Sequence, residues 1–288
     1  MTDNMNIQWY PGHMTKTRRQ IEADLKLVDA VCEIVDARIP VSSRNPDIDA
    51  ICGDKPRMIV LNRMDLADPA ATKKWAEYFR RKGMAVIATD CKSKKGISAF
   101  TPAARLACAE KLERDAKRGM NRPLRVMVVG IPNVGKSTLI NQISGRKSAK
   151  AENRPGVTRG KQWVTVDSGL QLLDTPGILW PKFEDPEVGM MLAYTGAVKE
   201  GVIDLEELAY RLMELLHKFY PQTLLERYKV EAPEGTPGWQ LLEMAARKRG
   251  YLVSGGEVNT ERMAKVLLDE FRGGKLGNFT LEMPEDMV

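Results

Sequence analysis

The 288-residue chain has few of the residues that build disulfide frameworks and zinc sites. It contains 4 cysteines and 2 histidines, and no two cysteines have the CxxC spacing. A chain of this length can bury a hydrophobic core of its own without covalent cross-links. These scarcities argue against a disulfide-stabilised fold and against a structural zinc site.

Long hydrophobic runs are also missing. No apolar stretch approaches the roughly 20 residues that a membrane-spanning helix needs. The first residues, MTDNMNIQWYPGHM, lack both the basic-then-apolar pattern of a secretory signal and the composition of a transit peptide. We therefore expect a cytosolic protein that makes no use of a membrane.

The charge balance is moderately basic. Lys and Arg total 44 against 38 acidic residues, which gives a net charge of +6 and a pI near 9.0. Such an excess suits contact with a polyanion such as RNA. It is equally compatible with an ordinary solvated surface, so the charge alone does not decide between the two.

Short apolar runs alternate with helix-forming stretches over the first two-thirds of the chain. Each run is followed by polar or charged residues, as buried strands of a parallel sheet are. The expected strands are Ala30–Asp36, Arg57–Leu61, Ala85–Thr89, Leu124–Val129, Gln162–Val166 and Leu170–Leu173, and the expected helices cover Ala70–Lys82, Ile97–Lys117 and Thr138–Ile143. The alternation predicts an α/β domain with a mostly parallel sheet.

The last third of the chain has a different character. Three amphipathic helix candidates are joined there by turns rich in Pro and Gly, namely Leu205–Phe219, Gly238–Lys248 and Thr260–Arg272. We expect residues 1–200 to form the α/β domain and residues 205–288 to form a small α-helical domain.

A phosphate-binding loop follows the fourth expected strand. The segment GIPNVGKST at residues 130–138 matches GxxxxGK[ST] and leads into a helix, which is the context that the motif requires. Backbone N–H groups of such a loop converge on phosphate oxygens at a helix N-terminus. Lys136 would reach the β- and γ-phosphates, and the Ser137 hydroxyl would ligate Mg²⁺. The other nucleotide-binding residues expected here are Asn133, Val134, Gly135 and Thr138.

Two later segments complete the expected phosphate site. In DTPG, Asp174 would hold the Mg²⁺ shell and the backbone N–H of Gly177 would sense the γ-phosphate. In RPGVTRG, Thr158 is the expected second Mg²⁺ ligand and γ-phosphate sensor, on a loop that orders when triphosphate binds. A simple turn and an ordinary basic loop are the alternative interpretations of these two segments.

The segment Asn62-Arg63-Met64-Asp65 follows the second expected strand and resembles the NKxD guanine motif of GTPases. The Asp65 carboxylate can accept hydrogen bonds from guanine N1–H and the 2-amino group, which adenine does not offer in that arrangement. Asn62 would tie this loop to its neighbours, and Arg63 can stack its planar guanidinium on the base.

The segment Asp90-Cys91-Lys92 follows the third expected strand and resembles the SAK element of GTPases. That element contacts guanine O6 through a backbone N–H, which does not depend on the side chains of Cys91 and Lys92. Both base-reading segments precede the phosphate loop, whereas ordinary GTPases have them after it. The same sheet can form in either order if the natural ends are joined, and residues 119–123 would be that join.

Taken in this order, the segments NRMD, DCK, GIPNVGKST, PGVTRG and DTPG resemble the circularly permuted GTPases. More narrowly, QWYPGHM, VDARIPVSSRNP and YLVSGGEVNTERMAKVLLDEFRGGKLGNFT are similar to the ribosome biogenesis GTPase A (YlqF) family. The resemblance covers nearly the whole chain. It implies a protein that binds the large ribosomal subunit, both rRNA and ribosomal proteins, late in assembly, and whose hydrolysis of GTP to GDP the subunit stimulates. It also implies that the C-terminal domain is similar to RNA-binding ANTAR domains.

The resemblance also assigns roles within the site. Ile178 follows DTPG where many GTPases have a water-orienting Gln, and the proposed substitute in the family is the His of PGHM, which is His13 here. Asn133 resembles the position associated with K⁺ dependence in related GTPases. From the residues alone, a loop histidine such as His13 is more often a surface or packing residue than a catalytic one.

Two classes of function fit these observations. The first is a GTPase that acts on the large ribosomal subunit. The second is a GTP-gated RNA-binding module in which hydrolysis is incidental, with the basic clusters Arg146-Lys147, Arg159-Gly160-Lys161 and Arg247-Lys248-Arg249 as its main surface. Hydrolysis stimulated by RNA or the subunit would separate the two. A P-loop ATPase or small-molecule kinase would leave NRMD without a role.

Overall fold

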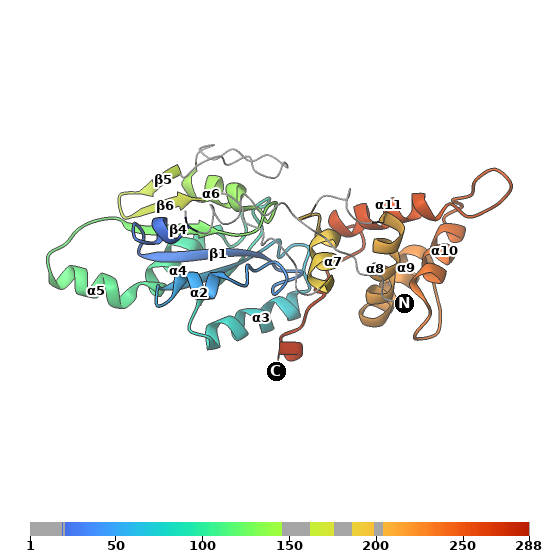
Figure 1. Ribbon diagram of the computed structural model, residues 1–288, viewed down its shortest axis with the longest axis horizontal. Coiled ribbons are helices and arrows are strands. Elements are labelled where there is room, and N and C mark those ends of the chain that lie inside the picture. Colours follow the sequence, from blue (N-terminus) through green and yellow to red (C-terminus); the bar gives the residue numbers. More distant parts are fainter. Residues whose placement is uncertain (1–18, 20, 146–161, 176–185, 199–203, 288) are drawn as a thin grey trace. The chain divides into compact units, whose positions relative to one another are not determined.

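The computed structural model describes residues 19, 21–145, 162–175, 186–198 and 204–287. The chain divides into two compact units (Figure 1). One unit, called the GTPase unit after the resemblance noted in the sequence, contains the described residues before α7 (Pro186–Thr195) together with the C-terminal tail from Glu282. The other, the helical unit, contains the described residues from α7 to Leu281.

This division differs from the expected boundaries of 1–200 and 205–288 at two places. Helix α7 belongs to the helical unit because Arg272, on α11, donates hydrogen bonds to the Ala193 and Tyr194 carbonyls at 2.7 and 3.0 Å. The tail from Glu282 belongs to the GTPase unit because it bonds to that unit through side chain and backbone.

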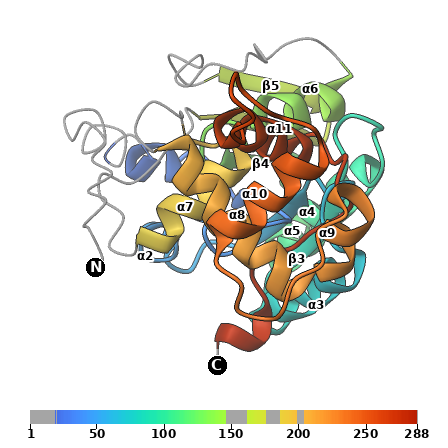
Figure 2. The ribbon, with the colours of Figure 1, turned by 90° about the vertical axis from the view of Figure 1, so that its right-hand side faces the viewer.

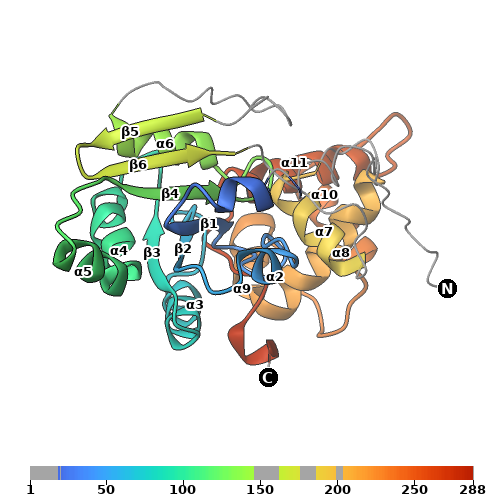
Figure 3. The same ribbon diagram turned by 60° about the vertical axis from the view of Figure 1, so that its left-hand side comes forward.

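The GTPase unit is built on one sheet of six strands in the order β3-β2-β1-β4-β6-β5 (Figure 3). The strands are β1 (Ala30–Asp36), β2 (Arg57–Asn62), β3 (Ala85–Thr89), β4 (Leu124–Val129), β5 (Gln162–Asp167) and β6 (Leu170–Asp174). All neighbouring pairs are parallel except β5 with β6, which form an antiparallel hairpin. The expected mostly parallel α/β sheet is therefore confirmed.

Helices cover the sheet because its strands β1, β2 and β4 are buried along nearly their whole length, on both faces. The GTPase-unit helices are α2 (Ile48–Cys52), α3 (Pro69–Arg81), η1 (Ile97–Ala99), α4 (Phe100–Ala107), α5 (Ala109–Lys117), α6 (Lys136–Ser144) and, in the tail, η3 (Pro284–Met287). Val31 and Val35 of β1 lie on one face, in clusters with residues of α2 and α3 respectively. Helix α4 packs against β1, β2 and β3, and α6 packs against β5 and β6.

The helix expected over Ile97–Lys117 is interrupted in the structure. It consists of the turn η1 and the helices α4 and α5, with a break at Cys108, whose backbone has φ −108° and ψ 18°. Cys108 is buried, and α4 buries Phe100 and Ala104, whereas α5 has no buried residue. Good helix propensity continues through the break, so only packing against the sheet explains where α4 ends.

The helical unit is an α-helical cluster (Figure 2). Its helices are α7, α8 (Leu205–Phe219), α9 (Pro221–Tyr228), α10 (Gly238–Lys248) and α11 (Thr260–Arg272). The expected helices α8, α10 and α11 are present with the expected bounds, and α8 and α11 begin after side-chain caps from Asp204 and Asn259. Their buried faces supply the core, including Leu212, Leu242 and Leu267. Among the described residues, no helix is both long and apolar enough to cross a bilayer.

Candidate nucleotide site

The expected base-reading segments follow the neighbouring strands β2 and β3, and the expected phosphate-binding segments follow the neighbouring strands β4 and β6, with β1 between the two pairs. Strands β1, β2 and β4 are parallel, so their carboxyl ends lie at one edge, with Asp36 paired in register with Asn62. After β1 the chain adds β2 and β3 on one side of the sheet, and after β4 it adds β6 and β5 on the other side. The strand order therefore reverses between β1 and β4, which is a topological switch point. Ligands of open α/β sheets bind at such points.

The phosphate loop joins β4 to α6 in a conformation that needs particular residues. Asn133 and Gly135 both have positive φ, of 61° and 102°, a region that Gly and Asn tolerate best. A Cβ atom on Gly135 would also lie 2.4 Å from Asn62 Nδ2. Gly135 is therefore required both by its backbone and by the side chain beside it.

Lys136 begins α6 and is 6% exposed. Its Nζ lies 2.7 Å from Asp174 Oδ1, at the end of β6, and also donates to the Thr175 carbonyl. The Thr175 hydroxyl is bonded in turn to the Val128 carbonyl of β4 at 2.8 Å. Two expected site residues from distant parts of the sequence, Lys136 and Asp174, are thus in direct contact.

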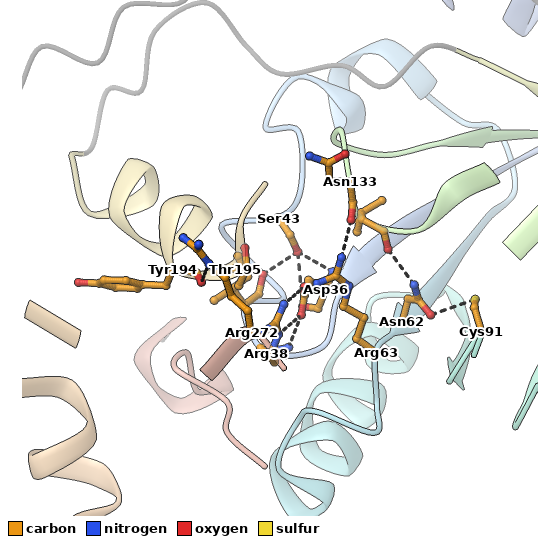
Figure 4. A network of polar contacts seen from close by, with 12 residues as sticks. Asp36, Arg38, Ser43, Asn62, Arg63, Cys91, Asn133, Tyr194, Thr195 and Arg272 are labelled. Carbon is orange, nitrogen blue, oxygen red and sulfur yellow. Dashed lines mark hydrogen bonds and ion pairs between the residues drawn. The ribbon is translucent and has the colours of Figure 1, made fainter. Parts of the chain in front are cut away.

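Asn62 is the polar centre that joins three loops (Figure 4). It is 2% exposed, and its Nδ2 donates to the Val134 carbonyl of the phosphate loop at 2.7 Å. Its Oδ1 accepts from Thr89 Oγ1 and Cys91 Sγ, each at 3.1 Å. Burial raises the pKa of the Cys91 thiol to about 11, so the thiol stays protonated at neutral pH and can donate.

Arg63 makes a second link between the same loops. Its backbone has φ 59°, and its guanidinium donates to the Asn133 carbonyl at 2.7 Å. The Arg63 Nε lies 3.7 Å from Asp36 Oδ2 (Figure 4). The side chain is 30% exposed, so it spans from a buried carboxylate to the surface of the phosphate loop.

Asp36 and Arg38 were assigned no role from the sequence, although VDARIPVSSRNP contains both. Arg38 is fully buried and binds the Asp36 carboxylate through Nε at 3.0 Å and a terminal nitrogen at 2.8 Å. Burial alone would raise the pKa of Asp36, but the charge and hydrogen bonds of Arg38 outweigh burial and hold that pKa below its ordinary value. An Asp that ends a fully buried strand, with an Arg two residues later, was the signal that could have identified them.

The other base-reading residues lie at the surface of this edge. Asp65 is exposed in the turn after β2, and Lys92 is exposed in the turn after β3. The Asp90 carboxylate accepts from the Lys92 backbone N–H at 2.8 Å, which fixes that turn. Gly96 closes it with φ 78°, and a Cβ there would lie 2.1 Å from the Ala88 carbonyl.

The oxygen donors at this edge fit Mg²⁺ bound together with a nucleotide. Ser137 supplies a hydroxyl and Asp174 a carboxylate, the hard ligands that Mg²⁺ prefers. Among the described residues, no group of three or more His, Cys, Asp and Glu side chains could hold a metal alone.

Several predicted site residues lie outside the described residues. They are His13, Thr158, Gly177 and Ile178, and the basic clusters at 146–147 and 159–161 lie there as well. In the third basic cluster, Arg249 stacks on Tyr228 and pairs with Glu270 inside the helical unit, whereas Arg247 and Lys248 are exposed.

Comparison with known proteins agrees with this geometry. A family model described as 50S ribosome-binding GTPase matches residues 125–220. Ribosome biogenesis GTPase A of Bacillus cereus is 46% identical over 284 residues, which cover 98% of this chain and 95% of that protein.

Two solved structures are also similar to the chain. The GDP-bound structure of TM YlqF has a TM-score of 0.67 at 30% identity, covering 93% of this chain and 100% of that one. GNP-bound YlqF from T. maritima has a TM-score of 0.62 at 29% identity, covering 94% and 99% respectively. The chain therefore belongs to the ribosome biogenesis GTPase A family, and it is a GTP hydrolase with a P-loop GTPase domain.

Proposed function

We propose that this protein binds the large ribosomal subunit late in its assembly, in the cytosol, and hydrolyses GTP to GDP and phosphate there. The observation that carries the proposal is the direct joining of the base-reading loop to the phosphate loop by Asn62 and Arg63. The name of the family model, which refers to the 50S ribosome, supports the choice of the large subunit.

Guanine would be read by two loops that share Asn62 as their anchor. The exposed carboxylate of Asp65 accepts from N1–H and the 2-amino group, and the backbone at Cys91 and Lys92 donates to O6. Adenine offers the Asp65 carboxylate neither of these two donors, and losing such hydrogen bonds costs several kcal/mol in comparable polar sites. GTP is therefore favoured over ATP.

Hydrolysis would proceed by in-line attack of water on the γ-phosphate. Amides of the phosphate loop, from Asn133 to Thr138, and the Lys136 ammonium stabilise the charge on the β- and γ-oxygens. Because Lys136 is bonded to Asp174 at 2.7 Å, entry of the triphosphate exchanges one anionic partner of Lys136 for another. The exchange leaves the Asp174 carboxylate available to the ion that accompanies the nucleotide.

Mg²⁺ supplies neutralisation of the phosphate charge when bound, and the side chains that would hold it are Ser137, Thr158 and, through water, Asp174. Thr158 and the Gly177 backbone N–H sense the γ-phosphate. Asn133 is the proposed K⁺ ligand, at the positive-φ position of the loop. Replacing K⁺ by Na⁺ in the assay should slow hydrolysis if Asn133 has this role, and an equal rate in both salts would remove it.

His13 is the proposed residue that orients the attacking water, since Ile178 offers no polar group. A neutral imidazole, with an ordinary pKa of about 6.5, can accept the water proton. His13→Ala should lower subunit-stimulated turnover and leave GTP affinity intact. Unchanged turnover on the subunit would exclude this role.

The test of the proposed function is binding of the purified protein to large subunits by co-sedimentation, with GTP, GDP or no nucleotide, followed by hydrolysis in the same mixtures. Nucleotide-dependent binding together with faster hydrolysis supports the proposal. Nucleotide-dependent binding without faster hydrolysis would instead make the protein a GTP-gated RNA-binding module.

A further inference from the structure

The C-terminal tail makes contacts with the GTPase unit that neither the motifs nor the proposed hydrolysis accounts for. One carboxylate oxygen of Glu282 accepts from the Val41 backbone N–H at 2.6 Å. The other accepts from the Ser42 backbone N–H at 3.0 Å and from the Ser42 hydroxyl. The carboxylate thus caps the turn at residues 39–43, which follows β1.

Two further contacts hold the tail in place. The Trp75 indole on α3, which is fully buried, donates to the Glu282 carbonyl at 2.8 Å. Lys74 and Glu285 form an exposed ion pair at 2.8 Å. In Figure 1 the short helix at the C-terminal end lies beside α3, in agreement with these contacts.

The capped turn supports Asp36 at the nucleotide edge. Ser43 Oγ donates to the Ile39 carbonyl at 2.6 Å and accepts from the Asp36 backbone N–H at 2.9 Å (Figure 4). Directly before the turn lies Arg38, which bonds both oxygens of the Asp36 carboxylate. The Asp36 carboxylate in turn faces Arg63, the residue that holds the Asn133 carbonyl of the phosphate loop.

We propose that Glu282 is a positioning residue for the nucleotide site, acting through the capped turn and Asp36 to hold Arg63 against the phosphate loop. The C-terminal tail is then a latch on the nucleotide edge, and its docking slows nucleotide release. The proposal rests on the assignment of this edge as the nucleotide site.

The position of Glu282 in the chain gives a partner of the helical unit a way to act on the latch. Within the helical unit, the Tyr220 hydroxyl bonds both the carbonyl and the N–H of Thr280, at 2.9 and 3.1 Å. Only Leu281 separates that anchor from Glu282. Two residues span at most about 7 Å. A partner that displaces Thr280 by more than this distance would therefore also displace Glu282 from the capped turn.

The test is the release rate of a fluorescent GDP analogue, followed by stopped flow in the full-length protein. Glu282→Gln replaces an acceptor oxygen by a donor that faces backbone N–H groups, so release should accelerate about 3- to 10-fold. Glu285→Gln breaks only the exposed pair with Lys74 and should leave release unchanged. The thermal midpoint of each variant reports whether it is folded.

Arg63→Ala separates a positioning role from a merely structural one. Arg63→Ala alone should accelerate release, and adding Glu282→Gln should then have no further effect, because the two act along one path. Ser42→Ala, which removes only the hydroxyl contact, is the milder variant, and the same non-additivity with Arg63→Ala is expected.

Release that is unchanged in Glu282→Gln, or an effect of Glu282→Gln that persists undiminished beside Arg63→Ala, would overturn the latch. Lys136→Ala distinguishes this failure from a failure of the site. If Lys136→Ala leaves GDP binding unaltered, the nucleotide edge itself is misassigned, and the proposed role of Glu282 is then rejected as well.

Discussion

The two units differ in the number of charged residues that they bury. Of the buried charged residues that the structure describes, all but Glu270 belong to the GTPase unit. At the nucleotide edge these include Asp36, Arg38, Lys136 and Asp174, each paired with an opposite charge. The helical unit instead has an ordinary apolar interior, with residues such as Leu212 and Leu267 fully buried.

The difference has a physical meaning. Burying an ion pair brings little net stability, because desolvation offsets most of the attraction. Several such pairs gathered at one edge therefore make that edge a candidate site for binding or chemistry. Among the described residues of the helical unit, the buried charge is Glu270, which pairs with Arg227 and Arg249. Replacing residues in each unit should therefore produce effects of different kinds.

The largest expected effect is on hydrolysis, in the GTPase unit. Lys136→Ala should reduce GTP turnover by about 100- to 1000-fold, the usual loss on removing one donor to transition-state charge. Single-turnover hydrolysis of GTP measures it. The matched control is Lys117→Ala, an exposed lysine of α5, which should retain full activity. Comparable losses in both would mean that Lys136 has no special role.

The next effect concerns the base. Asp65→Asn should weaken GTP binding by about 100-fold, because an amide cannot accept from both guanine donors. Xanthine has an oxo group at C2, where guanine has an amino group, and the Asn amide can donate to it. The variant should therefore bind xanthosine triphosphate better than the parent does. Competition between the two nucleotides checks this, and unaltered guanine preference would contradict the assignment of Asp65.

A smaller effect is expected from the buried carboxylate of the helical unit. Glu270 accepts from Arg227 Nε at 2.9 Å and from the Tyr228 hydroxyl at 2.8 Å. Glu270→Gln should lower the stability of this unit by about 1–3 kcal/mol, visible as faster hydrogen exchange in α11. GDP affinity should not change. Glu243→Gln, in an exposed pair with Arg247, is the control.

The same carboxylate predicts a dependence on pH. The hydrogen bond from Arg227, more than any other contact, holds the pKa of Glu270 below its ordinary value of 4.5. The stabilisation is therefore complete above pH 4.5 and is lost as the pH falls through the lower pKa of the folded state. Acid should accelerate hydrogen exchange in α11 of the parent more than in α11 of Glu270→Gln. Equal acceleration in both would contradict a stabilising contact between Glu270 and Arg227.

The smallest effect on stability is expected at the exposed basic residues of α10. Replacing Arg247 and Lys248 together by Ala should change stability by less than about 0.5 kcal/mol, yet weaken binding to large subunits and reduce its salt dependence. Arg114→Ala with Lys117→Ala removes the same charge from α5. Equal losses of subunit binding in both pairs would indicate nonspecific charge rather than a surface of the helical unit.

The sequence predicted those parts of the molecule that local patterns determine. The six strands and helices α8, α10 and α11 follow from apolar periodicity, and the phosphate loop follows from its glycines and Lys136. The break at Cys108 was missed because helix propensity is continuous there, and α7 and α9 were not predicted.

The candidate site was predictable only in part, for a related reason. NRMD and the phosphate loop are recognisable segments, whereas the pair of Asp36 with Arg38 and the capping by Glu282 join residues that no motif connects. The Glu282 contact spans 240 residues of sequence. Such contacts depend on the folded register of β1, the following turn and the tail.

The measurement that tests the central claim most directly is steady-state GTP hydrolysis in K⁺ buffer, with and without purified large ribosomal subunits. We predict slow hydrolysis by the protein alone and a strong increase when subunits are added, with ATP hydrolysed in neither case. An unchanged rate on subunits to which the GTP-loaded protein is bound would contradict it.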